Sequence, residues 1–152
     1  MIEIEGNIWD YHARGHWIVI TTNGCVRKDG AAVMGRGIAA QTKDRIPDFP
    51  YLLGHHIVVS GNTVGVFSNE RIITMPVKHN WWERANLELI EKSAAGLSAL
   101  CSTWVSRLHL PPMVVYMVRP GCGNGGLSWE VVKPILEKYL DDRFVVIEKG
   151  AG

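Results

Sequence analysis

The glycines between positions 121 and 126 have the clearest potential for chemistry. Gly121, Gly123, Gly125 and Gly126 stand directly after an apolar run and directly before an amphipathic segment that begins near Ser128. At a turn from a strand to a helix, glycines let backbone N–H groups approach an anion, and the helix N-terminus adds partial positive charge. The pattern therefore favours a phosphate or diphosphate ligand over a turn that needs glycine only for positive φ.

A second glycine-rich segment, Gly35-Arg36-Gly37, opens another predicted helix. Two helix openings that face each other would suit a diphosphate held between two loops. Arg36 either adds charge to such a site or is a solvated surface arginine. Asn23 ends a predicted strand, where its amide either binds a ribose hydroxyl or shapes the turn.

Lys78 is the candidate for nucleophilic or acid/base chemistry. It follows a predicted strand, in a segment that Pro76 and the bulky side chains of Trp81 and Trp82 make rigid. A lysine amine at such a position can act as a nucleophile or as an acid/base group. A hydrated surface lysine is the alternative reading, and His79 is a neighbouring acid/base candidate.

Other reactive residue types stand in less informative patterns. His55 and His56 have no evident third ligand, so we expect neither a metal site nor a cofactor. Cys122 lies among the glycines without an identifiable base partner, which favours a small packed thiol. Four tryptophans are candidates either for stacking on a base or for core packing: Trp9, Trp81, Trp82 and Trp129.

Hydrophobic patterning predicts the elements that position these residues. Strands are expected at residues 2–5, 17–22, 71–75, 114–118 and 143–147. A β-hairpin is expected from residues 56–60 and 63–67, around Gly61 and Asn62. Helices are expected from the segment 33–43, which ends before Pro47, and within 83–107 and 128–140.

Strands that alternate with helices predict an α/β fold, a three-layer α/β/α domain with a central mixed, mainly parallel sheet. In such a sheet, three loops should converge at the carboxyl edge: the loop from Asn23 onward, residues 76–82 and residues 121–126. Ligands of open α/β sheets bind at that edge. The predicted convergence therefore supports a ligand site more strongly than any single motif does.

Composition limits the class of protein. With 152 residues, of which 47% are hydrophobic, the chain is expected to form one globular domain spanning residues 1–152, and to be a monomer. A net charge of +1 argues against holding long nucleic acid by electrostatics alone. The odd number of cysteines, the absence of a signal-peptide core and the absence of a bilayer-length apolar run predict a cytoplasmic protein with no membrane partner.

The motifs resemble those of the macrodomain family, in the branch that holds terminal ADP-ribose protein glycohydrolase and the DarG antitoxin macrodomain. The resemblance is carried by Asn23, residues 33–41, Lys78 with Pro76 and Trp81, and residues 121–129. These motifs follow one another in the family's order over nearly the whole chain, and the last is the most specific. The resemblance implies a macrodomain fold and an ADP-ribose cleft.

The resemblance also implies roles for individual residues. Asn7 and Ile8 would lie near the adenine end of the ligand, and Asn23 near the distal ribose. Lys78 matches the lysine with which hydrolytic members attack or activate the anomeric carbon. The residues expected to bind ADP-ribose are Asn7, Ile8, Asn23, Gly35, Gly37, Ile38, Gly121, Cys122, Gly123, Asn124, Gly125, Gly126 and Leu127.

Two features depart from the family pattern. Residues 25–32 lengthen the loop after Asn23. The glycohydrolase has an aspartate in the second glycine loop, whereas here that loop offers Asn124 and no carboxylate and more closely resembles the loop of the antitoxin. The expected function is an ADP-ribosyl hydrolase with Lys78 as catalytic residue, acting on an ADP-ribosylated nucleic acid base or protein carboxylate. The alternatives are a non-catalytic ADP-ribose reader, an ADP-ribose 1″-phosphate phosphatase, and a domain that binds another nucleotide or only a protein partner.

Overall fold

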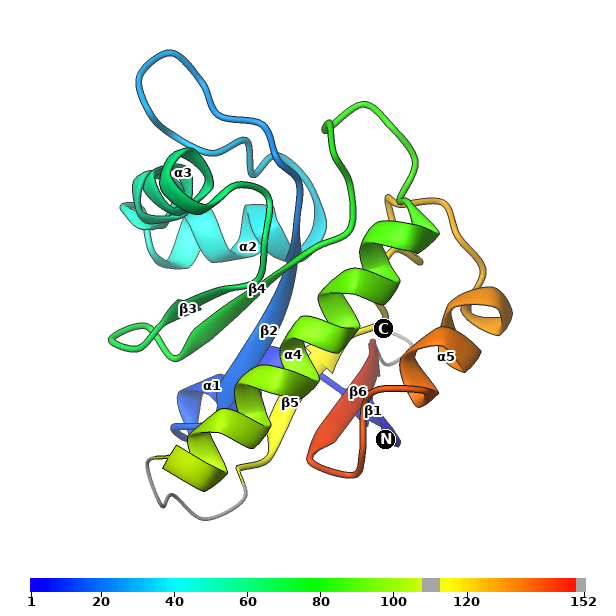
Figure 1. Cartoon of the computed structure of the whole chain (residues 1–152). Helices are drawn as coiled ribbons and strands as arrows, with labels where there is room; N and C mark the ends of the chain where they lie inside the picture. Colours follow the sequence, from blue (N-terminus) through cyan, green and yellow to red (C-terminus); the bar gives the residue numbers. More distant parts are fainter. Residues whose placement is uncertain (108–112, 150–152) are drawn as a thin grey trace.

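The computed structural model describes residues 1–107 and 113–149 (Figure 1). The strands in these residues are β1 (Ile2–Gly6), β2 (Trp17–Thr22), β3 (Gly65–Phe67), β4 (Ile72–Pro76), β5 (Val115–Val118) and β6 (Phe144–Lys149). The helices are α1 (Ile8–Ala13), α2 (Gly37–Arg45), α3 (Phe49–Ser60), α4 (Leu87–Arg107) and α5 (Trp129–Glu137).

The six strands form one sheet in the order β1-β6-β5-β2-β4-β3. Every neighbouring pair is parallel except β3 and β4, which are antiparallel. The prediction of an α/β fold with a mixed, mainly parallel sheet is therefore confirmed. Parallel strands end at one edge, so the segments that follow β1, β2, β4, β5 and β6 meet there.

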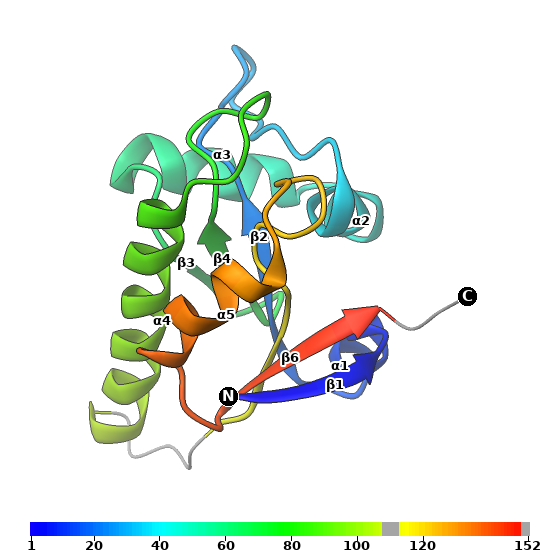
Figure 2. The ribbon, with the colours of Figure 1, turned by 90° about the vertical axis from the view of Figure 1, so that its right-hand side faces the viewer.

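Helices cover both faces of the sheet (Figure 2). The side chains of β2 alternate between the faces, since successive residues of a strand point in opposite directions. Ile18 and Ile20 pack with Phe49 of α3 on one face, where α1 and α2 also contribute to the core. Val19 packs on the other face with α4 and α5, through Ile90 among others. The structure thus has the three expected layers.

The predicted hairpin is wrong in its first strand, because residues 56–60 are the end of α3. Val58 and Val59 favoured a strand because they are β-branched, yet they are 73% and 68% exposed. Phe49 and Leu53, one turn apart, are buried against the sheet, and this packing overrides the local β propensity. Pro50 lies in the first turn of α3, where proline is tolerated.

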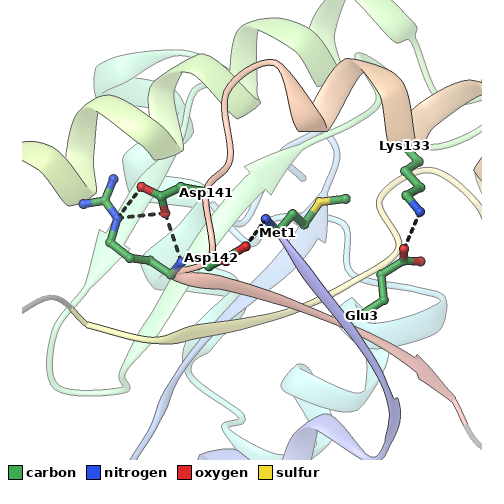
Figure 3. A network of polar contacts seen from close by, with 6 residues as sticks. Met1, Glu3, Lys133, Asp141 and Asp142 are labelled. Carbon is green, nitrogen blue, oxygen red and sulfur yellow. Dashed lines mark hydrogen bonds and ion pairs between the residues drawn. The ribbon is translucent and has the colours of Figure 1, made fainter.

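Polar contacts fix the edge strand β1 (Figure 3). The Met1 ammonium group lies 2.8 Å from the Asp142 carboxylate, in the turn before β6. Glu3 of β1 accepts from the Lys133 ammonium group at 2.6 Å and from Trp129 Nε1 at 2.8 Å. The hydrogen bond from Lys133 is the main cause that lowers the pKa of Glu3. These contacts join the start of β1 to α5 and to the turn before β6.

None of the helices in the described part of the chain is long and apolar enough to cross a bilayer.

Candidate functional site

A cavity of about 880 Å³ lies at the carboxyl edge of the sheet. Its wall includes the ends of β1, β6, β5 and β2, and Val77, which directly follows β4. The loop from Asn23 onward, the loop that contains Lys78 and the glycine-rich loop at 121–126 all contribute residues to this wall. The predicted convergence of three loops is therefore confirmed, and the volume is in the range of small-molecule sites.

The two glycine-rich helix openings face each other across one side of this cavity. A Cβ atom placed on Gly37, which has a φ of 57°, would lie 3.3 Å from Nδ2 of Asn124. At the start of α2 the N–H groups of Gly37, Ile38 and Ala39 precede the first intrahelical bond, and the N-cap residue Arg36 provides no side-chain acceptor. These N–H groups therefore remain available to an anion.

The second glycine loop, residues 121–126, is held in shape by its own backbone. The N–H of Leu127 donates to the Gly121 oxygen at 2.9 Å, and the N–H of Gly126 donates to the Gly123 oxygen at 3.1 Å. Ala85 donates to the Gly125 oxygen at 2.9 Å. Within residues 1–107 and 113–149, no group accepts a hydrogen bond from the N–H groups of the consecutive residues 123–125. A fixed loop with free N–H groups is a suitable anion site.

Lys78 is half-buried where two of the loops meet. Its Nζ lies 3.4 Å from the backbone oxygen of Trp81 and 3.4 Å from that of Asn124. The backbone of Lys78 is held by Asn62, whose Nδ2 donates to the Lys78 oxygen at 2.9 Å. The amine is thus positioned in the cavity beside the second glycine loop, whereas the exposed His79 does not line the cavity.

Asn23 lines the cavity, but its amide also shapes the loop after β2. Its Nδ2 donates to the Val33 oxygen at 3.0 Å, and its Oδ1 accepts from the Cys25 N–H at 2.9 Å. Both ends of the amide therefore take part in loop structure, as the turn-shaping reading requires. One hydrogen of Nδ2 and one lone pair of Oδ1 remain for a ligand.

All charged residues in the described wall of the cavity are basic. They are Arg27, Arg36, Arg45, Lys78, Arg119 and Lys149. Because the whole chain carries a net charge of only +1, this positive charge is a local feature of the cavity. A cavity lined by charge of one sign concentrates ligands of the opposite sign, so the site favours an anion.

Trp9 anchors the part of the cavity wall next to Asn7. Its Nε1 donates to Gln41 Oε1 at 2.7 Å, and the Arg45 guanidinium carbon lies 4.4 Å from its ring centroid. Gln41 and Arg45 were not predicted as site residues. Their spacing of four and eight residues from Gly37 places all three on one face of α2, and this spacing is the signal that could have identified them.

Neither a protein-family model nor a curated protein sequence matches the chain. Solved structures do match. The macrodomain of Thermus aquaticus DarG is 24% identical with a TM-score of 0.70, over 98% of this chain and 97% of that one. The macrodomain of Mycobacterium tuberculosis DarG is 26% identical with a TM-score of 0.68, over 90% of each chain. Thermosipho africanus DarTG in complex with ADP-ribose is 17% identical with a TM-score of 0.70, over 97% of this chain and 41% of that one.

The chain has the macrodomain fold. The resemblance of its motifs to those of macrodomains is thereby confirmed at the level of architecture. The bound ADP-ribose belongs to the Thermosipho protein. In this chain, most residues of the predicted set line one cavity: Asn7, Ile8, Asn23, Gly35, Gly37, Ile38, Lys78, Gly121, Gly123, Asn124 and Gly125.

Three residues of the predicted set do not line the cavity: Cys122, Gly126 and Leu127. Leu127 packs against the core, and the Gly126 oxygen accepts from the Arg84 guanidinium group. Burial is the main cause that raises the pKa of the Cys122 thiol, which donates to the Pro120 oxygen at 3.5 Å. A protonated, packed thiol is the form that these contacts favour.

Four other candidates do not line the cavity: His55, His56, Trp82 and Trp129. Trp129 contacts Glu3 on β1, and His56 contacts the Thr63 backbone oxygen. Within the residues that the structure describes, no group of three or more histidine, cysteine, aspartate or glutamate side chains is placed to hold a metal ion.

Proposed function

We propose that this macrodomain is an ADP-ribosyl hydrolase, with Lys78 as the catalytic residue. The observation that carries the proposal is the position of the Lys78 amine, which faces the cavity and lies 3.4 Å from the Asn124 oxygen in the second glycine loop. A diphosphate held at the two glycine-rich openings would place the distal ribose of ADP-ribose beside this amine.

The diphosphate part of the ligand is supported by the charge and the free N–H groups of the cavity. The N–H groups at the start of α2 and those of residues 123–125 have no acceptor in the described chain. The surrounding charged residues are all basic. The structural match to Thermosipho DarTG in complex with ADP-ribose adds support, because part of that protein has this fold and the protein is in complex with that ligand.

The reaction uses the electrophilic anomeric carbon, C1″, of a linked ADP-ribose. When the amine attacks, a C–N bond to C1″ forms as the bond from C1″ to the target breaks, and the target leaves with a proton. Water then adds to C1″, displaces the amine and completes the release of ADP-ribose. The contacts of Nζ with the oxygens of Trp81 and Asn124 limit where the amine can lie. Positioning of this kind is a main source of catalytic rate.

Exposed aromatic rings beside Lys78 favour a nucleic acid base as the modified target. Trp81 lines the cavity and is 49% exposed, and Trp82 is 64% exposed. The two rings form a T-shaped pair with centroids 5.7 Å apart. Exposed aromatic faces stack on bases regardless of their sequence. A protein carboxylate is the second target that we propose.

A non-catalytic ADP-ribose reader is the second candidate function. One observation favours it: no carboxylate lines the described part of the cavity, so Lys78 has no acidic partner there. The second glycine loop offers Asn124 and no carboxylate, and an amide cannot supply a proton as a carboxylic acid does. A reader would bind ADP-ribose through the same loops without turning over any linkage.

The test compares the wild-type protein, Lys78→Ala and Lys92→Ala, which removes an exposed lysine of α4 away from the cavity. Each protein is incubated with ADP-ribosylated single-stranded DNA and with glutamate-linked ADP-ribosyl protein, and free ADP-ribose is measured by chromatography. We expect Lys78→Ala to lower the rate at least about 100-fold, and Lys92→Ala to leave it unchanged. Equal release by wild type and Lys78→Ala would exclude the catalytic role of Lys78.

Calorimetry with free ADP-ribose separates the two candidate functions. The hydrolase predicts that Lys78→Ala still binds ADP-ribose, because the glycine openings hold the diphosphate. Binding by the wild type without turnover of either linkage would support the reader instead.

A further inference from the structure

The end of the cavity far from Lys78 carries polar and charged side chains to which the proposed function assigns no role. The cavity borders the ends of five strands, so at about 4.8 Å per strand it extends about 19 Å along the sheet edge. Lys78 follows β4 at one end. Asn7 and Lys149 lie at the other end, where β1 and β6 pair with Gly6 opposite Lys149. We refer to the wall formed by Asn7, Trp9, Gln41, Arg45 and Lys149 as the distal end.

Trp9 organises the distal end. The residue is only 6% exposed, so its ring is fixed by the core beneath it. Its Nε1 donates a hydrogen bond to the Gln41 side chain, and the Arg45 guanidinium group lies over its ring. Gln41 and Arg45 lie one helical turn apart on α2 and both line the cavity. A buried tryptophan thus holds two polar side chains at the cavity wall.

The orientation of both distal amides follows from their contacts with Trp9. Asn7 Oδ1 accepts from the Trp9 backbone N–H at 3.0 Å, and Gln41 Oε1 accepts from Trp9 Nε1 at 2.7 Å. Because a backbone N–H and an indole N–H only donate, the amide oxygens must be the accepting atoms. No described residue accepts from the two NH₂ groups, so these donors are left for a ligand.

The distal end also carries positive charge without a partner. Arg45 and Lys149 form no ion pair with any described carboxylate. Arg119, farther along the same edge, differs because its guanidinium group lies 3.1 Å from the Glu148 carboxylate. The side chains at the distal end therefore offer a ligand mainly donors, of which two are charged, beside one remaining lone pair on each amide oxygen.

We propose that the distal end binds a phosphoryl group on the adenosine ribose, so that the preferred ligand is ADP-ribose with a third phosphate at its 2′ or 3′ hydroxyl. Adenine has acceptor ring nitrogens as well as a donor amino group, but it carries no charge and would leave the Arg45 and Lys149 cations without a counter-charge. Phosphoryl oxygens accept several hydrogen bonds and carry charge, which guanidinium and ammonium groups complement. This inference rests on the proposed function, because the orientation of ADP-ribose in the cavity comes from it.

Calorimetry on the full chain tests the inference with three ligands: ADP-ribose, 2′-phospho-ADP-ribose and 3′-phospho-ADP-ribose. We expect one phosphorylated ligand to bind about tenfold or more tightly than ADP-ribose. Arg45→Gln and Lys149→Gln should each weaken binding of the phosphorylated ligand severalfold more than binding of ADP-ribose, and so reduce this preference. Lys43→Gln removes a charge from the same helix outside the cavity wall and should keep the preference.

The outcomes separate the inference from the proposed function. Equal affinity of the wild type for all three ligands would overturn the inference and leave the proposed ADP-ribose site intact. Failure of all three to bind would overturn both. A preference that persists in Arg45→Gln and in Lys149→Gln would show that the third phosphate binds elsewhere. Thermal unfolding of each variant without ligand shows whether it is folded. If Arg45→Gln does not fold, Lys149→Gln still tests the inference, because Lys149 lies at an exposed strand end.

Discussion

The Lys78 amine and the Asn124 backbone oxygen lie 3.4 Å apart, although 46 residues separate them in the sequence. Lys78 follows β4 and Asn124 follows β5, so the contact crosses the end of β2, which lies between these two strands. The Asn124 side chain also faces Gly37, at the start of α2. One loop residue therefore lies next to both the candidate catalytic amine and the other glycine-rich opening.

The Lys78→Arg variant distinguishes two roles of Lys78: a nucleophilic amine, and a cation that only positions the loops through the oxygens of Trp81 and Asn124. The guanidinium group can still donate to the oxygens of Trp81 and Asn124, but it stays protonated and does not act as a nucleophile. We expect normal thermal stability and a release rate at least about 100-fold lower, measured on the substrates used for Lys78→Ala. Activity close to that of wild type would assign Lys78 a positioning role only.

Two glycines of the same loop are predicted to respond differently to alanine. At Gly123 no atom lies within 4 Å of an added Cβ, and φ is not left-handed, so Gly123→Ala should fold normally. Its methyl group would obstruct a ligand and should weaken ADP-ribose binding about tenfold, as measured by calorimetry.

Gly125→Ala is the matched variant with the opposite expectation. An added Cβ would overlap the Gly121 oxygen and lie 2.8 Å from the Ala85 side chain. We expect a loss of about 1–3 kcal/mol in the free energy of unfolding, visible as a lower Tm. If Gly123→Ala lowered the Tm as much as Gly125→Ala does, the distinction between an open and a packed glycine would be wrong.

Asn23→Ala should mainly destabilise the loop after β2. It removes the hydrogen bonds with Val33 and Cys25, which together are worth about 1–3 kcal/mol. Thermal unfolding without ligand measures this loss, and calorimetry measures any further loss of ADP-ribose affinity. An unchanged Tm combined with weaker binding would instead assign the amide to the ligand.

The ion pair between Glu3 and Lys133 predicts a pH-dependent stability. Because the pKa of Glu3 is lowered in the folded protein, its contribution is present above the ordinary glutamate pKa and is lost as the pH falls through the lowered value. The difference in Tm between wild type and Glu3→Gln should therefore be small but largest near neutral pH, and should vanish in acid. A difference that grows as the pH falls would contradict this assignment.

The hairpin expected at residues 56–67 shows where local pattern fails. The exposed Val58 and Val59 favoured a strand, whereas α3 forms because Phe49 and Leu53 of the same segment are buried against the sheet. The short helix α1 was not predicted, because six residues are too few for a periodic pattern. In contrast, β2 was predicted at its observed bounds, since a continuous run of apolar and β-branched residues is typical of a strand buried on both faces.

The sequence by itself determined the class of fold, the two glycine-rich openings and the position of Lys78 after a strand, because these depend on residue type and on spacing along the chain. Only the tertiary structure decided which side chains share the cavity wall. Gln41, Arg45 and Lys149 come from α2 and β6, and their place beside Asn7 depends on the pairing of β1 with β6 and on contacts with Trp9. Strand order and packing between layers arise from contacts between distant residues, and no local pattern contains them.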